Sequence, residues 1–304
     1  MGRSLRADRY IASVITKCDN LVRTGLWRGS PTIRVNAWMN NFENQDKVAA
    51  AMVLDHFVFI SSGSVEAMLI ATYRQLRNRI FSQMSYGAAV EYLDNLVFTS
   101  VEGEDPNVTD SGNFMCRKLR QVLALPDNRF VEPDEAFKLA NTGKGIVFVD
   151  DFLGSGSQFL STWKRDYPSG SQQSFKTLYD SGSLRAHYIV LVATRNGIDR
   201  LQSDIDGFAI TTSHVLDNSM SVRALPWNPL SPDEFDPKEE IPKFLEKYSA
   251  RLHVDQYLEH TEGRQYGYGS LGLLIAFEHS TPDATIPLLW APGPQQWTPL
   301  IRRV

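Results

Sequence analysis

Two consecutive carboxylates followed by a glycine- and serine-rich turn are the residues of this chain best suited to chemistry. They lie in the stretch IVFVDDFLGSGSQ, residues 146–158. Its four leading apolar residues predict a buried strand, and open α/β sheets bind ligands at the carboxyl ends of their strands. Because adjacent strand residues point to opposite faces, one carboxylate of Asp150 and Asp151 can reach a ligand while the other braces the turn or meets a second hydroxyl.

The turn after the two acids has the composition of a phosphate cradle. Gly154 and Gly156 permit close approach of the backbone, and Ser155 and Ser157 add hydroxyl donors. The helix that follows directs its unpaired N–H groups at the loop. We therefore predict a site for one phosphate monoester. The alternative is a strand end at which the aspartates cap a turn and the glycines and serines form an ordinary loop.

Strands and helices alternate around this motif. Apolar or β-branched runs predict strands at 96–101, 145–150, 187–194 and 208–212, with helices between them. Strands that are apolar throughout are typical of a parallel sheet covered on both faces. We predict an α/β fold with a mainly parallel sheet flanked by helices, in which residues 145–150 form a central strand. A late apolar run at 271–278 predicts a strand that returns to this sheet.

The N-terminal part has a helical period instead. Apolar spacing predicts helices at 44–60 and 65–80, so residues 1–85 are expected to form a helical appendage and residues 86–304 the α/β domain with a C-terminal extension. Residues 1–34 carry seven Lys and Arg against two acids. This basic arm is either a solvated amphipathic helix or a surface that touches a phosphate backbone or an acidic partner.

Composition excludes several classes of protein. Hydrophobic residues make up 42% of the chain, which excludes a disordered tail protein, and the net charge is −4. A negative net charge argues against a surface that binds nucleic acid or anionic lipid over a large area, except through the basic arm. Since there is no long apolar run and Cys18 and Cys116 lie far apart, we expect a cytoplasmic protein that binds no membrane.

The stretch 146–158 resembles the signature of the type I phosphoribosyltransferases. The resemblance implies a phosphoribosyltransferase-like fold in which Asp150 and Asp151 act as catalytic residues, hold the ribose hydroxyls of phosphoribosyl pyrophosphate (PRPP) and share a Mg²⁺ ion. It assigns the 5-phosphate to the loop residues Ser155, Gly156 and Ser157, and the neighbouring Gly154 and Gln158 are further candidate substrate contacts. Gly154 and Gln158 depart from the family pattern, and the second change removes a threonine hydroxyl, which the amide of Gln158 could replace.

The family also has a pyrophosphate loop after an earlier strand, and SVEGEDP at 100–106 stands in that place. Glu102 and Gly103 are then candidate substrate contacts, but the segment holds three acids and no base, so a diphosphate needs a metal ion there. Arg195 is the candidate replacement cation, and His279 could meet a base or a nucleotide edge. A solvated arginine and a surface histidine are the alternatives.

A second resemblance covers nearly the whole chain. Trp38 and Phe42 before a helix, and the ending FEHSTP (277–282), IPLLW (286–290) and Trp297, resemble bacterial phosphoribosyltransferase-like proteins of conflict and anti-phage gene systems. It implies a nucleotide- or PRPP-binding regulator or antiviral defence effector, with atypical or lost transferase activity and a partner protein from the same gene system. The alternative is an active, magnesium-dependent phosphoribosyltransferase, a glycosyltransferase acting on a base or nucleotide.

Overall fold

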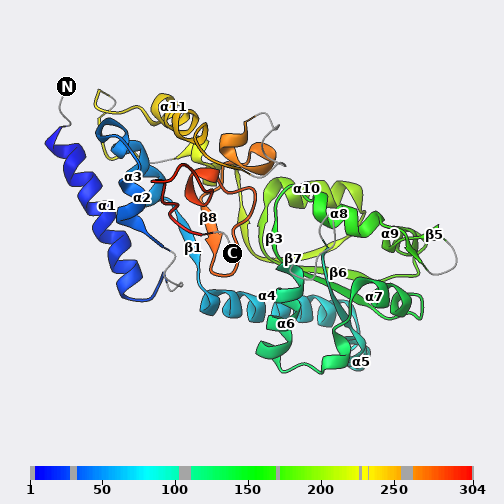
Figure 1. Ribbon diagram of the computed structural model, residues 1–304. Helices are drawn as coiled ribbons and strands as arrows, with labels where there is room; N and C mark the ends of the chain where they lie inside the picture. The colour runs from blue at the N-terminus through cyan, green and yellow to red at the C-terminus, as the bar shows by residue number, and fades with distance from the viewer. Residues whose placement is uncertain are drawn as a thin grey trace. The chain divides into compact units, whose positions relative to one another are not determined.

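The chain folds into two compact units, which are described one at a time (Figure 1). The computed structural model describes residues 4–27, 33–102, 111–168, 172–225, 228–231, 233–254 and 263–302. One unit is the continuous segment 63–216, and the other combines residues 1–62 with 217–304.

The continuous unit is built on a four-stranded parallel sheet with the order β2-β3-β6-β7. Its strands are β2 (Val97–Ser100), β3 (Ile146–Leu153), β6 (Ala186–Thr194) and β7 (Ala209–Leu216). The predicted parallel sheet is confirmed, and β3 lies in its interior between β2 and β6. Ile146, Val147, Phe148 and Val149 are fully buried, as a strand covered on both faces requires.

Strand β3 continues three residues beyond the predicted end. Phe152 and Leu153 pair with Val192 and Ala193 of β6, so the ladder carries the chain through both aspartates. Asp150 and Asp151 therefore have strand geometry, and the loop begins only at Gly154.

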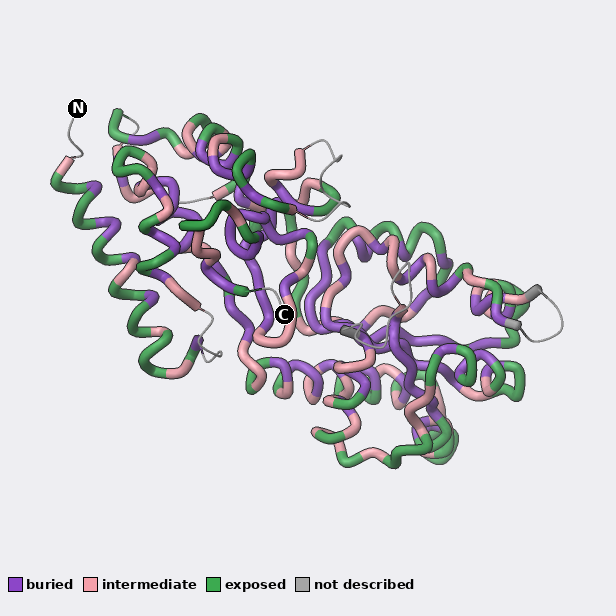
Figure 2. Tube along the Cα trace, viewed as in Figure 1, coloured by how far each residue is buried: buried purple, intermediate pink, exposed green. Residues whose placement is uncertain are grey.

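Helices cover the sheet on both faces, and Figure 2 shows the strands as the buried layer. They are α4 (Ser62–Gln83), α5 (Tyr86–Asn95), α6 (Ser111–Leu123), α7 (Pro133–Ala140), α8 (Ser157–Lys164), α9 (Phe175–Asp180) and α10 (Arg195–Asp204), with a small hairpin of β4 (Tyr167–Pro168) and β5 (Gln172–Gln173). An aromatic cluster fills one face, where Phe159 stacks on Tyr188 with ring centroids 4.5 Å apart and also contacts Phe148. This packing seats α8 directly after the candidate loop.

The second unit joins the two ends of the chain. It contains α1 (Leu5–Arg23), α2 (Val35–Met39), α3 (Lys47–Asp55), β1 (Val58–Ile60), α11 (Pro237–Ser249) and β8 (Ile275–Phe277), with several short 3-10 helices. Strands β1 and β8 pair in parallel. The fully buried indole of Trp38 donates to the carbonyl of Leu288 at 2.9 Å, which links the N- and C-terminal segments.

Three expectations differ from the structure. The helix expected at 44–60 ends at Asp55, because residues 58–60 pair as a strand with β8. The late strand at 271–278 is shorter and pairs with β1 instead of returning to the four-stranded sheet. The division at residue 85 also differs, since α4 and α5 belong to the sheet unit and residues 217–304 group with the N-terminal helices.

The contacts of α4 explain the different division. The hydroxyl of Ser213 in β7 donates to the carbonyl of Met68 at 3.2 Å, and Arg79 donates to the carbonyl of Ile210 at 3.4 Å. The helix thus covers one face of the sheet. Its amphipathic pattern predicted a helix correctly but carried no information on which part of the chain it packs against.

The basic N-terminal segment forms an amphipathic helix where it is described. Helix α1 buries Tyr10, Ile11, Val14 and Cys18, and Lys17 pairs with Asp55 at 2.5 Å. None of the helices in the described ranges has the length and apolar character needed to cross a bilayer.

Candidate functional site

The two aspartates lie near the carboxyl end of β3 and are almost completely buried, with exposures of 2% for Asp150 and 4% for Asp151. One oxygen of Asp150 accepts the backbone N–H of Asp151 at 2.9 Å, and the other accepts the hydroxyl of Tyr188 at 3.4 Å. Burial, together with the two carboxylates, holds the pKa of Tyr188 well above its usual range, so its hydroxyl remains a donor. The acid pair is thus held in a fixed place on the central strand.

The loop after β3 turns through a left-handed glycine. Gly156 has a φ of 80° and precedes the first residue of α8. A side chain at this position would be strained, and its Cβ would lie 3.3 Å from Leu201. The hydroxyl of Ser155 donates to that of Ser157 at 3.1 Å. The N–H of Ser157 donates to the hydroxyl of Ser155 at 3.4 Å, and the next N–H groups of the first turn of α8 face the loop, which favours a bound anion.

The N-terminus of α10 also lies against this loop. The hydroxyl of Thr194 caps the helix by accepting the N–H of Gly197 at 2.9 Å and donates to the carbonyl of Gly154 at 2.6 Å. A Cβ at Gly197 would lie 2.2 Å from the carbonyl oxygen of Gly154, so only glycine permits this approach. Two helix N-termini, each with a partial positive charge, therefore converge on residues 154–157.

Arg200 is a site residue that the sequence reasoning missed. Its guanidinium, on α10, donates to the carbonyl of Ser155 at 3.0 Å and to the hydroxyl of Ser157 at 2.9 Å. Among the described residues no carboxylate forms an ion pair with it. The loop thus contacts a cation on α10 whose charge no carboxylate of the described residues neutralises.

Arg195 was the cation that the sequence suggested. It is the exposed first residue of α10, and within the described residues no hydrogen bond joins it to the loop. Arg195 and Arg200 lie on the same helix, and the orientation of that helix determines which of them reaches the loop. Arg195 as a ligand contact stays a prediction.

Glu102, two residues after the end of β2, braces α8. Its carboxylate accepts hydrogen bonds from Arg165 and, at 3.3 Å, from the hydroxyl of Tyr167. Its backbone N–H donates to the hydroxyl of Thr162 at 3.1 Å. Burial raises the pKa of Glu102, and the charge of Arg165 opposes that rise. Glu102 therefore has a matched positive partner, which the sequence of residues 100–106 did not reveal.

The remaining predicted residues lie in different places. Gln158 is the second residue of α8, next to the loop. Gly103 lies outside the described residues. His279 follows β8 in the other unit, where its ring lies 5.2 Å from that of Phe277. The structure thus brings together the aspartates and residues 154–158, while ligand contacts by Glu102, Gly103 and His279 stay predictions.

The acid pair fits a metal ion only when a ligand shares it. In the described part of the chain no three His, Cys, Asp or Glu side chains gather as a metal site. Mg²⁺ commonly takes one or two carboxylates and completes its shell with substrate phosphates and water. Asp150 and Asp151 supply such a carboxylate pair, and a bound diphosphate would supply the other oxygens.

Comparisons with known proteins place the chain in a family. It is similar to the structure of the AQ2163 protein from Aquifex aeolicus at 13% identity and a TM-score of 0.28, over 41% of this chain and 56% of that one. The match thus spans little more than half of that protein's length. No curated protein matches the chain. The family model described as PRTase-CE matches residues 35–303, across both units, and the chain therefore belongs to this phosphoribosyltransferase-like family.

Proposed function

We propose that the protein binds a ligand containing ribose 5-phosphate, either PRPP or a nucleotide, at the end of β3. The observation that carries the proposal is the junction of two buried carboxylates with a loop on which two helix N-termini and Arg200 converge. Carboxylates accept hydrogen bonds from sugar hydroxyls, and oriented N–H groups with a guanidinium favour a phosphate. The two aspartates and the loop lie consecutively in the chain, so a single sugar phosphate can contact both.

The bound ligand follows from the chemistry of each half. Its 5-phosphate accepts from the first-turn N–H groups of α8, from the hydroxyls of Ser155 and Ser157, and from Arg200. Its ribose hydroxyls donate to the carboxylates of Asp150 and Asp151. A Mg²⁺ ion shared by these carboxylates and a ligand phosphate would neutralise part of the negative charge.

We favour a regulatory or defence-system effector in which transferase activity is atypical or lost. The loop lacks the threonine that the transferase signature places at the position of Gln158, and residues 100–106 hold three acids and no base. A protein that binds the ligand without turning it over can report its level to a partner protein, and a protein of the same gene system is the partner we propose. Cytoplasmic placement is part of this proposal.

Calorimetric titration tests the binding proposal. PRPP, ribose 5-phosphate and nucleoside monophosphates are each titrated with and without Mg²⁺ into the wild-type chain and into the variant Asp150→Asn/Asp151→Asn. We expect PRPP to bind weakly and only with Mg²⁺, monophosphates to bind without it, and the variant to lose affinity for each. If no member of the set binds, or if the variant binds as the wild type does, the proposal is wrong.

An active transferase is the second candidate, and one contact favours it. The ion pair between Arg165 and Glu102 neutralises one of the acids that would repel a diphosphate. In such a reaction a base nitrogen bonds to the anomeric carbon, the bond from that carbon to oxygen breaks, and pyrophosphate leaves. The charges of Asp150 and Asp151 would stabilise the positive sugar in the transition state. Release of pyrophosphate from PRPP in the presence of a free base, lost in Asp150→Asn/Asp151→Asn, would establish this activity.

A further inference from the structure

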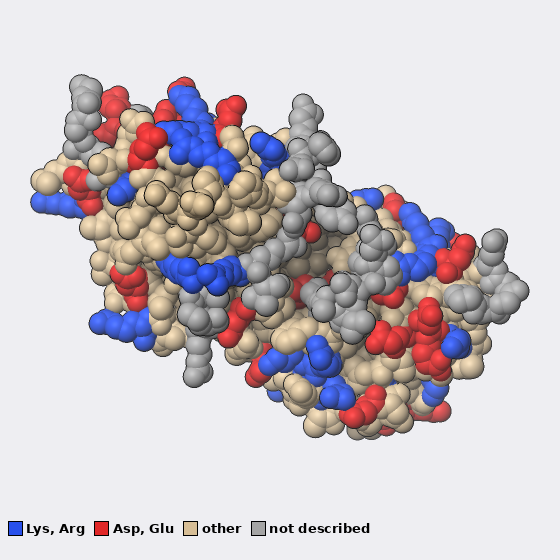
Figure 3. All heavy atoms as spheres, viewed as in Figure 1, with Lys and Arg blue, Asp and Glu red and all other residues tan. Residues whose placement is uncertain are grey.

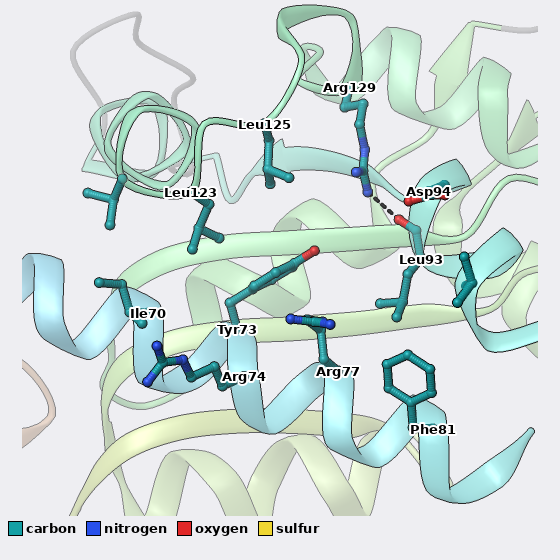
Figure 4. Close-up of a pocket in the computed structure, with 12 residues that line it drawn as sticks. Ile70, Tyr73, Arg74, Arg77, Phe81, Leu93, Asp94, Leu123, Leu125 and Arg129 are labelled. Atoms are coloured by element: carbon teal, nitrogen blue, oxygen red, sulfur yellow. Dashed lines mark hydrogen bonds between the residues drawn. The ribbon is translucent and has the colours of Figure 1, made fainter. Parts of the chain in front are cut away.

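A second pocket lies in the sheet unit and contains none of residues 150–158. It has a volume of about 530 Å³ and is formed by α4, α5, the end of α6 and the segment after it. Figure 4 shows side chains from α4 on one side and Leu123, Leu125 and Arg129 on the other. Its lining residues are Ile70, Tyr73, Arg74, Arg77, Phe81, Val90, Leu93, Asp94, Val122, Leu123, Leu125 and Arg129. Pockets of this size are large enough for a small-molecule ligand.

Helix α4 presents two different stripes. One is buried against the sheet and contains Val65, Met68, Leu69, Thr72, Leu76 and Ile80. The other lines the pocket with Ile70, Tyr73, Arg74, Arg77 and Phe81, which recur at helical spacing. The helix thus places two arginines and two aromatic rings along one wall of a cavity.

The charge of the pocket is positive. Three guanidinium groups line it, those of Arg74, Arg77 and Arg129, against the single carboxylate of Asp94. In the described ranges none of the three arginines forms a salt bridge. Such an excess in a concave, partly apolar site attracts anions.

Arg129 is held in place by neutral groups. It donates to the carbonyl of Leu96 at 2.9 Å and to the carbonyl of Leu93, and it lies 5.2 Å from the ring of Phe98. These partners orient the guanidinium without cancelling its charge. Burial lowers the pKa of Arg129, and the nearby Tyr73 hydroxyl and Asp94 carboxylate oppose that shift.

The pocket and the β3 loop lie toward opposite ends of the strands. Leu93 and Leu96 come just before β2, whose first residue, Val97, pairs with the first residue of β3, Ile146. Asp150 and Asp151 lie at the other end of β3. A ligand in the pocket therefore does not touch the loop and occupies a separate site.

We propose that this pocket binds a nucleoside phosphate, with the base on the apolar wall and the phosphates on the arginines. Pyrophosphate alone would leave Ile70, Leu123 and Leu125 uncovered, and a nucleoside alone would leave an excess of two positive charges without an anion. Arginine and aromatic side chains together suit both parts of a nucleotide, because guanidinium planes bind phosphate oxygens and aromatic rings stack on bases. The inference goes beyond the site on β3 and does not depend on it.

Calorimetry with the four ribonucleoside triphosphates, titrated one at a time, tests this site in the full chain. The pocket variant is Arg74→Gln/Arg77→Gln, since both arginines are exposed and their loss leaves the packing of α4 intact. A charge-matched control is Lys138→Gln/Lys176→Gln, on the exposed surfaces of α7 and α9 in the same unit. We expect at least one triphosphate to bind the wild-type chain and the control equally, and the pocket variant to bind it at least about tenfold more weakly.

A loop variant, Ser157→Ala/Arg200→Gln, separates this site from the proposed function. If the pocket is a separate site, the loop variant still binds the triphosphate at the site that the pocket variant has lost. Pyrophosphate and the ribonucleoside with the same base should each bind the pocket more weakly than the triphosphate that binds. The proposal is overturned if none of the four triphosphates binds, if the pocket variant binds them as the wild type does, or if the loop variant alone abolishes binding.

Discussion

At the scale of single residues, Arg200 supplies the β3 loop with a positive charge from a distant part of the chain. It contacts Ser155 and Ser157 from positions more than forty residues further along. We predict that Arg200→Gln weakens the binding of ribose 5-phosphate about tenfold, the usual effect of losing one charge-assisted hydrogen bond. Isothermal titration calorimetry at constant salt measures this change.

Arg195→Gln is the matched control for that experiment. It removes the same charge from the same helix at an exposed position. Equal losses of affinity in the two variants would mean that Arg200 acts only through long-range electrostatic attraction. That result would contradict a direct contact between Arg200 and the phosphate.

His187 makes the stability of the sheet unit dependent on pH. The residue is 8% exposed in β6, its Nε2 lies 3.0 Å from the hydroxyl of Tyr92, and its Nδ1 is buried with no partner among the described residues. Burial and then the charges of Arg79 and Arg185 lower its pKa to about 4, so the ring is neutral in the folded chain. Because unfolding restores a pKa near 6.5, the unfolded state binds the proton more readily and the stability contribution is lost as the pH falls.

We therefore predict that the free energy of unfolding falls as the pH is lowered from about 6.5 to about 4. The part due to this ring should be on the order of 3 kcal/mol at most. Urea unfolding of the wild type and of His187→Gln across this range measures it as the difference between the two slopes. The variant His214→Gln, at an exposed position on β7, should keep the wild-type slope. A slope unchanged in His187→Gln would show that the ring is not the titrating group.

At the scale of elements, the close approach of α10 to the loop after β3 determines the shape of the phosphate site. Gly197 permits this approach, because a Cβ there would lie 2.2 Å from the carbonyl oxygen of Gly154. We predict that Gly197→Ala displaces the loop, weakens ribose 5-phosphate binding and costs about 1–3 kcal/mol of stability. Titration calorimetry and urea unfolding on the same samples measure both effects.

Gly87→Ala provides the control for that substitution. Gly87 lies in α5, and a methyl group added there would have no neighbour within 4 Å among the described residues. Alanine at this position should therefore stabilise the chain by about 0.5–1 kcal/mol and leave binding unchanged. If Gly197→Ala bound the ligand with wild-type affinity, the contact between α10 and the loop would have no part in shaping the site.

The elements differ in how much of them the sequence could predict. The strand at 146–149 and the loop after it are local patterns, so their types and order follow from the residues themselves. The contacts of Arg200 and the pairing of Arg165 with Glu102 depend on how α10 and α8 are oriented by the aromatic core, which no local pattern encodes. The apolar spacing at residues 58–60 predicted a helix. These residues form a strand instead, because they pair with β8.

At the scale of the whole molecule, the chain inserts a continuous α/β unit between the two halves of another unit. The four strands of the main sheet and the helices that cover them lie within residues 63–216, with their own aromatic core. We predict that this segment, expressed alone, folds and unfolds cooperatively, as followed by circular dichroism during thermal and urea unfolding.

The segment 86–216 is the matched control, because it keeps the four strands and lacks α4. It should fail to unfold cooperatively, since the apolar face that Met68, Leu69 and Leu76 cover would be exposed to water. Cooperative unfolding of 86–216 with the stability of 63–216 would contradict the assignment of α4 to the sheet unit.

The surface charge fits a small ligand better than a nucleic-acid surface. The net charge is −4, and on the face drawn in Figure 3 basic and acidic side chains are interspersed. Extended binding to a phosphate backbone requires an uncompensated basic surface, whereas one ligand phosphate needs only local donors. The converging helix N-termini and Arg200 provide such donors at one place.

A crystal structure of the protein with ribose 5-phosphate tests the central proposal most directly. We predict that the phosphate lies within hydrogen-bond distance of the backbone N–H groups of residues 155–158 and of Arg200, with the ribose hydroxyls on Asp150 and Asp151. A ligand bound elsewhere, or a sugar phosphate that faces the aspartates with its phosphate away from the loop, would contradict the proposed site.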